Sequence, residues 1–379
     1  MTADSHRPVL PRLPQPLRQG CGARLGDTLY VGLGSAGHAW YALDLAADAP
    51  AWQRLADFPG VVREQPLALA AHGRIWVLGG AGQPRPGQPT VALDDMYSFD
   101  PATGVWQQLP SAPRGLLGAA ACVLPSGPLA FFGGVNPDVF RAYTSLLQRV
   151  TGQEDAAAAL TRQYLSQPCE AYRFPASVLG YDVQHGHWLD LGEGPVAGCA
   201  GSALVAQGKG LTLIHGEVKP GLRGTAIWHI HDDGDNLDWH EAPSSGPEGG
   251  LGEEGVAGAY AGDVQGTLLL AGGASFPGAR ARYAAGHRYA HQGLTKTWHD
   301  GIFALQGTRW QRVGQLPQGM GYGVSFALGD SLLLVGGEVQ GGAATDAVLR
   351  LHWDSASGAV RVSPSAHPPP HDSGLITAV

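Results

Sequence analysis

Residues 76–80 read Trp-Val-Leu-Gly-Gly, an apolar run of strand-forming residues that ends in two glycines. The chain carries this pattern six times, each time ending in a glycine pair or a near copy of one. The six runs are Tyr30-Val31-Gly32-Leu33-Gly34, Trp76-Val77-Leu78-Gly79-Gly80, Phe131-Phe132-Gly133-Gly134, Leu213-Ile214-His215-Gly216, Leu269-Leu270-Ala271-Gly272-Gly273 and Leu334-Val335-Gly336-Gly337. Short apolar runs bounded by glycine are typical of buried β-strands that end in a turn. Their recurrence predicts an internal repeat.

Tryptophans mark the second half of five of these repeats: Trp52, Trp106, Trp188, Trp239 and Trp310. The distance from each tryptophan to the last glycine of the next pair is nearly constant, at 28 (52 to 80), 28 (106 to 134), 28 (188 to 216), 34 (239 to 273) and 27 (310 to 337) residues. The distance from glycine to tryptophan within a repeat scatters from 18 (34 to 52) to 54 (134 to 188) residues. One half of the repeat therefore has a set length, and the other half accepts insertions.

This spacing resembles the kelch repeat, whose diglycine closes the second strand of a four-stranded blade and whose tryptophan lies on the fourth strand. The resemblance implies an all-β fold, a six-bladed kelch-type β-propeller that spans residues 1–379 as one domain. Length alone would suggest two or three domains, but stacked repeats share one continuous core.

The bulk composition excludes several classes of protein. The net charge is −8 and no basic stretch exists, which argues against a nucleic-acid partner. The four cysteines, Cys21, Cys122, Cys169 and Cys199, form no C-x-x-C pair, so neither a metal cluster nor a disulfide framework is expected. Residues 1–20 contain no apolar signal-peptide core and no run reaches membrane-spanning length. We therefore expect no membrane partner and a cytoplasmic location, or a periplasmic one if the chain is a trimmed mature form.

Every long insertion follows a glycine pair. Strands in a blade alternate in direction, so these loops and the connections that enter the next blade emerge on one face, around the mouth of the central channel. The longest insertion, residues 136–175 in blade three, predicts helices over 140–150 and 156–164 because apolar residues recur there at helical spacing. We expect this helical insertion to pack over the channel mouth, either as a structural cap or as a wall of a binding site.

Blade six lacks a closing tryptophan. The stretch 358–362 is a weak candidate for its outer strand, so we expect Val9–Leu17 to supply the missing fourth strand and close the ring. Residues 363–379 are predicted to form a mostly irregular tail.

Blade four departs from the pattern, because it reads His215-Gly216 where other blades carry two glycines. The segment GEVKPGLR at 216–223 then places Glu217 at the end of the second strand and returns Arg223 after a Pro-Gly turn. Two interpretations remain open at about even weight. In the first, Glu217 and Arg223 form an ion pair that stabilises the loop. In the second, Glu217 is a general acid/base and Arg223 is a guanidinium that binds an anion.

Other charged candidates are weaker. Glu338 also follows a glycine pair, and it either faces the pocket or caps a turn. His229 and His231 alternate on one strand without a third ligand nearby, which favours a strand surface over a metal site. His287 and His291 have i, i+4 spacing, but no glutamate between them supports metalloprotease chemistry. We expect no metal and no cofactor.

Several segments resemble the bacterial N-acetylneuraminate epimerase family, which are sialic acid mutarotases of the kelch class. They are GLGSAGHAWY at 32–41, Phe58-Pro59-Gly60 with Arg63 and Gln65, GGVN at 133–136 with Phe140 and Tyr143, GEVKPGLR at 216–223, Tyr289-Ala290-His291 with Gly293-Leu294, Tyr322-Gly323-Val324-Ser325, and Gly336-Gly337-Glu338. The similarity covers nearly the whole chain in order. Kelch spacing alone is weakly specific, whereas GEVKPGLR is a strong marker.

The resemblance implies that Glu217 is the proton acceptor and that Arg223 is essential. It also implies a small-molecule substrate, sialic acid, and it allows a homodimer. The candidate substrate-binding residues are Arg63, Gln65, Asn136, Tyr143, Arg280, Tyr289 and Tyr322. Met320 occupies a position where the family pattern has an arginine, so we expect a changed contact to the glycerol tail or the acyl group of the substrate.

The implied reaction is the interconversion of the α and β anomers of N-acetylneuraminate by acid/base ring opening, which makes the protein an isomerase. The alternative is a non-catalytic kelch module that binds a glycan or a protein. A sialidase-like hydrolase is a third possibility, but the chain carries no S-x-D-x-G-x-T-W repeats. The residues do not distinguish between sialic acid variants.

Overall fold

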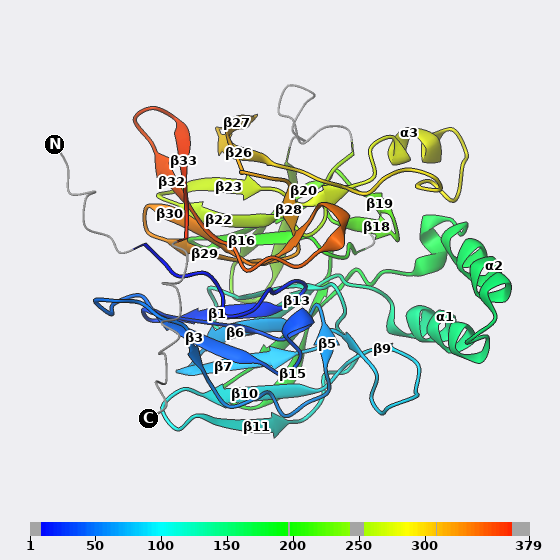
Figure 1. Cartoon of the computed structure of the whole chain (residues 1–379), viewed down its shortest axis with the longest axis horizontal. Helices are drawn as coiled ribbons and strands as arrows, with labels where there is room; N and C mark the ends of the chain where they lie inside the picture. The colour runs from blue at the N-terminus through cyan, green and yellow to red at the C-terminus, as the bar shows by residue number, and fades with distance from the viewer. Residues whose placement is uncertain (1–8, 196–197, 243–253, 308, 366–379) are drawn as a thin grey trace, which may run out of the picture.

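The computed structural model describes residues 9–195, 198–242, 254–307 and 309–365. Within these ranges the protein is mostly β-strand with few helices, and the main strands form six four-stranded antiparallel sheets (Figure 1). In chain order these sheets are β1 (Cys21–Leu25), β2 (Thr28–Gly32), β3 (Trp40–Asp44) and β4 (Gln53–Arg54); β6 (Leu67–Ala71), β7 (Arg74–Leu78), β10 (Met96–Asp100) and β11 (Val105–Leu109); β12 (Ala120–Val123), β13 (Leu129–Phe132), β14 (Ser177–Asp182) and β15 (His187–Glu193); β16 (Ala203–Gln207), β17 (Gly210–Ile214), β20 (Ile227–Asp232) and β21 (Leu237–Ala242); β22 (Tyr260–Val264), β23 (Thr267–Ala271), β26 (Gly301–Gln306) and β27 (Arg309–Gln315); and β29 (Val324–Leu328), β30 (Ser331–Val335), β32 (Val348–Asp354) and β33 (Ala359–Pro364).

The hydrophobic core lies between neighbouring sheets. Each of six large apolar clusters joins the faces of two consecutive sheets, and one of them joins the last sheet to the first. In that cluster Leu29 and Val31 of β2 pack with Leu333 and Val335 of β30. The first strands also contact one another in the order β1, β6, β12, β16, β22, β29 and back to β1. The sheets therefore form a closed ring, so each sheet buries both faces.

The glycine pairs and tryptophans occupy the predicted places. Each pair follows the second strand of its sheet, and Trp106, Trp188, Trp239 and Trp310 lie on fourth strands, while Trp52 directly precedes β4. The pair turns the chain out of the strand with positive φ, as at Gly79 (φ +68°). A Cβ on Gly79 would lie 2.3 Å from the carbonyl oxygen of Leu116. Glycine is required there because both the backbone angle and the close approach exclude a side chain.

The prediction that Val9–Leu17 forms the fourth strand of the last sheet is wrong. That strand is β33, from the weaker candidate region, and it pairs with β32. The N-terminal stretch instead buries Leu10, Leu13 and Leu17 between the last and first sheets. The prolines at 11, 14 and 16 have no N–H to donate to a ladder, so the stretch binds by leucine burial and isolated backbone bonds. Of the predicted irregular tail, residues 363–364 belong to β33, and residues 366–379 lie outside the described residues.

The loops that follow the second strands carry the helices and small sheets. The predicted helices are present as α1 (Pro137–Arg149) and α2 (Glu154–Leu165) between β13 and β14, and α3 (Ala279–Ala284) lies between β23 and β26. The small sheets are β5 (Arg63–Glu64) with β8 (Ala81–Gly82) and β9 (Val91–Ala92); β18 (Glu217–Lys219) with β19 (Leu222–Arg223); β24 (Ala274–Ser275) with β25 (Thr297–Trp298); and β28 (Met320–Gly321) with β31 (Glu338–Val339).

These additions gather on one side of the ring. β5 and β28 precede the first strand of their sheets and pair with β8 and β31, which follow second strands. The helices and the β18–β19 hairpin lie together on the right of Figure 1. The topological expectation that both kinds of connection emerge on one face is therefore confirmed. No helix in the described ranges is both long and apolar enough to cross a membrane.

Candidate active site

The β18–β19 hairpin, in the loop between β17 and β20 of the fourth sheet, holds the predicted proton acceptor Glu217 and the guanidinium of Arg223. Glu217 and Arg223 are directly opposed in the ladder of this hairpin, and a turn at Pro220-Gly221 joins the two strands. Gly221 has φ +79°, and a Cβ there would lie 1.8 Å from the Nδ1 atom of His291. The turn therefore accepts only glycine, which explains the Pro-Gly in the GEVKPGLR segment.

Lys219 anchors the hairpin to the surrounding loops. Its side chain is fully buried, and its ammonium donates hydrogen bonds to the backbone carbonyl oxygens of Leu165 (3.0 Å), Gln167 (2.5 Å) and Arg288 (2.7 Å). The ammonium also lies over the ring of Tyr172. The buried charge is thus fully hydrogen-bonded, and it ties the hairpin to the end of α2 and to the loop after α3.

Arg223 is held by contacts around its whole guanidinium group. Nε donates to the carbonyl oxygen of Ala274 at 3.0 Å, Nη2 donates to the hydroxyl of Tyr322 at 3.1 Å, and the group lies over the ring of Phe276. Nη1 lies 2.8 Å from Oε1 of Glu217, a charge contact that lacks hydrogen-bond geometry. Burial alone would lower the pKa of Arg223, but Glu217 and Tyr322 outweigh burial and raise that pKa above its ordinary value.

Glu217 and Arg223 differ in their access to solvent. The side chain of Glu217 is 26% exposed, whereas that of Arg223 is 2% exposed. Both line a cavity of about 430 Å³. The pair is therefore an ion pair, as one interpretation expected, but it lies in a cavity wall with its carboxylate accessible. A volume of this size falls in the range of small-molecule sites.

The cavity is bounded on one side by the helices and on the other by polar loop residues. Phe140 and Tyr143 of α1 and Tyr164 of α2 contribute aromatic surface, and the two tyrosine rings stack at 3.8 Å. The polar side chains that line it are Gln19, Gln65, Glu217, Arg223, His291, Lys296 and Tyr322. Apolar walls with a few converging polar groups are typical of sites that bind sugars and other small molecules. Among the residues described, no three His, Cys, Asp or Glu side chains are grouped so that they could hold a metal ion.

Five of the predicted site residues meet at this cavity: Gln65, Tyr143, Glu217, Arg223 and Tyr322. Gln65 reaches it through a left-handed backbone, with φ +54°. Tyr322 also has positive φ and receives the hydrogen bond from Arg223. Burial raises the pKa of Tyr322 to about 12, although Arg223 opposes the shift. Its hydroxyl therefore stays protonated at neutral pH.

Arg63 and Asn136 do not belong to the cavity, and their prediction as substrate-binding residues is corrected. The Arg63 guanidinium is fully buried and forms two hydrogen bonds with Asp95, at 2.6 and 2.7 Å. It also lies 4.7 Å from the ring centre of Phe58. Asn136 caps α1, because its side-chain oxygen accepts from the N–H groups of the next turn. Both residues are committed to internal contacts.

Arg280, Tyr289 and Met320 are also displaced from the expected positions. Arg280 lines a neighbouring cavity of about 360 Å³ behind the hairpin, and its Nη1 donates to the carbonyl oxygen of Arg223 at 3.0 Å. This hydrogen bond from Arg280 holds the backbone of Arg223 on the side away from the candidate active site. Tyr289 packs edge-on against His291, which lines the cavity in its place. Met320 is 1% exposed within the apolar core, so the expected change in a substrate contact is wrong.

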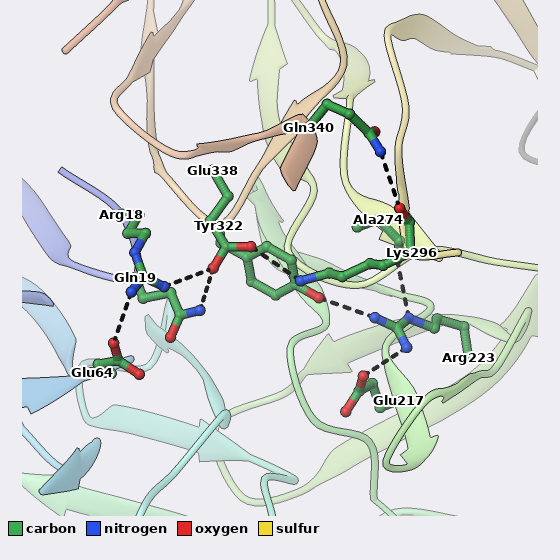
Figure 2. Close-up of polar contacts among 10 residues, drawn as sticks. All are labelled: Arg18, Gln19, Glu64, Glu217, Arg223, Ala274, Lys296, Tyr322, Glu338 and Gln340. Atoms are coloured by element: carbon green, nitrogen blue, oxygen red, sulfur yellow. Dashed lines mark hydrogen bonds and ion pairs between the residues drawn. The ribbon is translucent and has the colours of Figure 1, made fainter. Parts of the chain in front are cut away.

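Lys296 and Gln19 were missed by the sequence reasoning, and Glu338 was rated too low. Figure 2 shows Glu338 at the centre of a polar network opposite the hairpin. Its carboxylate is 2% exposed and accepts from Arg18 (3.3 Å), from Gln19 and from Lys296 (3.0 Å). Lys296 also lies over the ring of Tyr322, at 4.4 Å. The position of Glu338 directly after a glycine pair could have indicated its place near the cavity. Lys296 precedes a two-residue strand, and no sequence pattern marks it as a site residue.

The buried His215 and the partly buried His291, both near the hairpin, make stability depend on pH. Burial lowers the pKa of His215 from 6.5 to about 4, and Arg280 adds to this shift. Burial lowers the pKa of His291 to about 4 as well, with Arg223 adding to it. Between pH 6.5 and 4 the unfolded chain therefore binds more protons than the folded one. Stability contributed by these neutral imidazoles is present above pH 6.5 and is lost as the pH falls toward 4.

We expect the thermal midpoint of the wild type to fall over this pH window, and the fall to be smaller in the variant His215→Asn. The difference corresponds to roughly 3 kcal/mol of unfolding free energy at the acid end. Asparagine tolerates the positive φ of this position (+54°). Thermal unfolding at several pH values measures the effect, with His231→Asn as the control, because the His231 side chain is exposed on β20. Parallel pH profiles for wild type and His215→Asn would contradict the assignment.

The geometry defines a class of protein: a ring of antiparallel sheets with a carboxylate–guanidinium hairpin in the wall of a central cavity. Known proteins share the overall fold. The family model described as N-acetylneuraminate epimerase matches residues 10–360. A solved structure described as YjhT superposes with a TM-score of 0.89 and 36% sequence identity, covering 94% of this chain and 100% of that one.

Curated relatives carry the same description. The N-acetylneuraminate epimerase of Yersinia pestis (strain Pestoides F) is 43% identical over 346 residues, which cover 90% of this chain and 88% of the relative. That of Salmonella arizonae is 38% identical over 341 residues, covering 89% and 88%. The chain belongs to the N-acetylneuraminate epimerase family.

Proposed function

We propose that this protein is a sialic acid mutarotase, an isomerase that interconverts the α and β anomers of N-acetylneuraminate. Membership of the family supports the substrate. The observation that carries the proposal is the accessible carboxylate of Glu217, held 2.8 Å from a buried guanidinium in the wall of a cavity large enough for a monosaccharide.

The chemistry requires one group that moves a proton and a site that holds the sugar. A sialic acid is a cyclic hemiketal whose anomeric carbon carries a carboxylate. Glu217 accepts the proton of the anomeric hydroxyl as the bond between the anomeric carbon and the ring oxygen breaks and a ketone forms. The proton is then delivered to the former ring oxygen. After the carbonyl turns, the reverse steps close the ring on the other face. Arg223 holds the carboxylate of Glu217 in place throughout.

We infer that the scaffold is a single six-bladed kelch-type propeller, with the six sheets as its blades. Residues 136–175 would form a helical insertion of the third blade over the channel mouth. The contribution of Phe140, Tyr143 and Tyr164 to the cavity wall supports this role. A homodimer and the cellular compartment stay predictions.

The test is proton NMR on α-anomer freshly released by a sialidase. We expect the protein to accelerate appearance of the β-anomer well above the spontaneous rate. A wild-type rate no better than that of Glu217→Ala would contradict the proposal.

A binding module without activity is the alternative. A fully paired Glu217 and Arg223 on a solvent-exposed loop would favour it. The two residues do pair, but Arg223 is buried and both line the cavity. Calorimetric binding of sialic acid without any acceleration would support this alternative.

A further inference from the structure

The guanidinium of Arg223 is almost inaccessible to a substrate carboxylate. A carboxylate binds a guanidinium through two adjacent N–H groups. Here Nε is bound to Ala274, Nη2 to Tyr322, and Nη1 is buried against Glu217. The whole side chain is 2% exposed. The residue that the sequence suggested as an anion clamp therefore positions Glu217 and Tyr322 instead.

A second cation lines the same cavity. Among the described lining residues the basic side chains are Arg223, His291 and Lys296. Burial lowers the pKa of His291 to about 4, with Arg223 adding to it, so this imidazole is neutral at physiological pH. Lys296 is thus the charged donor that a ligand can reach, with a side chain that is 28% exposed.

Lys296 is also held in one place. Its ammonium donates to Oε2 of Glu338 at 3.0 Å and lies 4.4 and 4.5 Å from the ring centres of Tyr322 and Trp298. An ammonium has three hydrogens, and the described contacts give one of them a hydrogen-bond acceptor. Arg18 and Gln19 also bind Glu338, so this carboxylate is shared and does not belong to Lys296 alone (Figure 2). Glu64, which is half exposed, lies 3.6 Å from Arg18.

Tyr322 connects the two charged groups. Its hydroxyl accepts the hydrogen bond from Arg223, and the ammonium of Lys296 lies over the face of its ring. The Glu217–Arg223 ion pair and the Lys296 ammonium therefore flank one aromatic side chain in the same cavity. In a sialic acid the carboxylate is bonded directly to the anomeric carbon, so its binding group must lie close to the group that moves the anomeric proton.

We propose that Lys296, supported by Glu338 and Tyr322, binds the carboxylate of the substrate, while Arg223 acts as the positioning residue for Glu217. The inference rests on the proposed mutarotase function. It makes Lys296 a specificity-determining residue that selects acidic sugars over neutral ones.

The experiment compares N-acetylneuraminate with its methyl ester, which lacks the charge. In the variant Lys296→Met we expect kcat/KM for the acid to fall roughly 10- to 100-fold through KM, because a hydrogen bond to a charged group is lost. The value for the ester is expected to stay unchanged, so the preference for the acid disappears. Lys296→Arg should restore much of it. Lys209→Met, in the exposed turn between β16 and β17, is the matched control.

Removing Lys296 leaves the buried Glu338 with fewer partners, so folding is checked by thermal unfolding. The double variant Lys296→Met, Glu338→Gln removes the buried charge that has lost one of its partners, and it must show the same loss of preference. Equal losses for acid and ester, or no loss for either, would overturn the inference.

Calorimetric binding of the acid separates this inference from the proposed function. A wild type that binds the acid without accelerating anomerisation would overturn the mutarotase function, and the role of Lys296 is then decided by whether Lys296→Met weakens that binding. A wild type that neither binds nor converts the acid would overturn both.

Discussion

Replacing Glu217 with glutamine is expected to lower the rate constant of anomer interconversion by about 10²- to 10⁴-fold, the usual contribution of a positioned acid or base. Glutamine keeps the size of the side chain but cannot accept and return a proton at neutral pH. The hairpin should survive, because the backbone pairing of Glu217 with Arg223 and the anchor at Lys219 are unchanged. Proton NMR on freshly released α-anomer measures the rate, and circular dichroism checks the fold.

Glu241→Gln is the matched control for this substitution. Glu241 lies exposed on β21, the outer strand of the sheet that carries the hairpin, so its loss should leave the rate unchanged. A Glu217→Gln variant that keeps the wild-type rate constant would show that another group moves the proton.

Replacing Arg63 with methionine is expected to lower the free energy of unfolding by about 3–5 kcal/mol, as for other buried ion pairs that lose one partner. The Arg63 side chain is 0% exposed, and its loss leaves Asp95 and the carbonyl oxygens of Val61 and Gly79 without their donor. Denaturant unfolding measures the change. At denaturant concentrations at which Arg63→Met is still folded, we expect its KM for the sugar to equal that of the wild type, since Arg63 does not line the cavity.

The control for Arg63 is a surface ion pair with similar chemistry. Arg141 and Asp138 lie 2.8 Å apart on α1 but are 63% and 81% exposed. Arg141→Met should therefore cost about 0.5 kcal/mol or less. If Arg63→Met instead raised KM without loss of stability, the original prediction of Arg63 as a substrate ligand would be reinstated.

The candidate site shows how far local sequence rules reach. The hairpin was predictable because Glu217, the Pro-Gly turn and Arg223 are neighbours in the chain, and a tight turn places them together whatever surrounds it. Arg63 and Gln65 show the limit of such rules. They are two residues apart and both were assigned to the pocket, but the partner of Arg63 is Asp95, 32 residues away. That pairing draws Arg63 into the interior, while the left-handed backbone at Gln65 turns the next side chain toward the cavity.

Closing of the ring was predicted correctly in principle and wrongly in detail. The leucines of the N-terminal stretch are apolar enough to be buried at the joint, but its prolines cannot donate to a strand ladder. The outer strand came from β33, whose apolar pattern is weak, because pairing with β32 and packing against the neighbouring sheet compensate for low local preference.

The repeat, the ring of sheets and the face that bears the loops could all be predicted from local patterns in the chain. Each follows from backbone constraints within one repeat: positive φ at the glycine pairs, buried strands before them, and tryptophans at a set distance. Which polar side chains meet at and around the cavity depends on contacts between distant parts of the chain. Lys296 and Glu338 are 42 residues apart, and Gln19 and Glu338 are 319 apart, so their contacts exist only once the ring has closed. A charge is buried where a partner from another sheet can satisfy it, and that partner cannot be read from its neighbours in the chain.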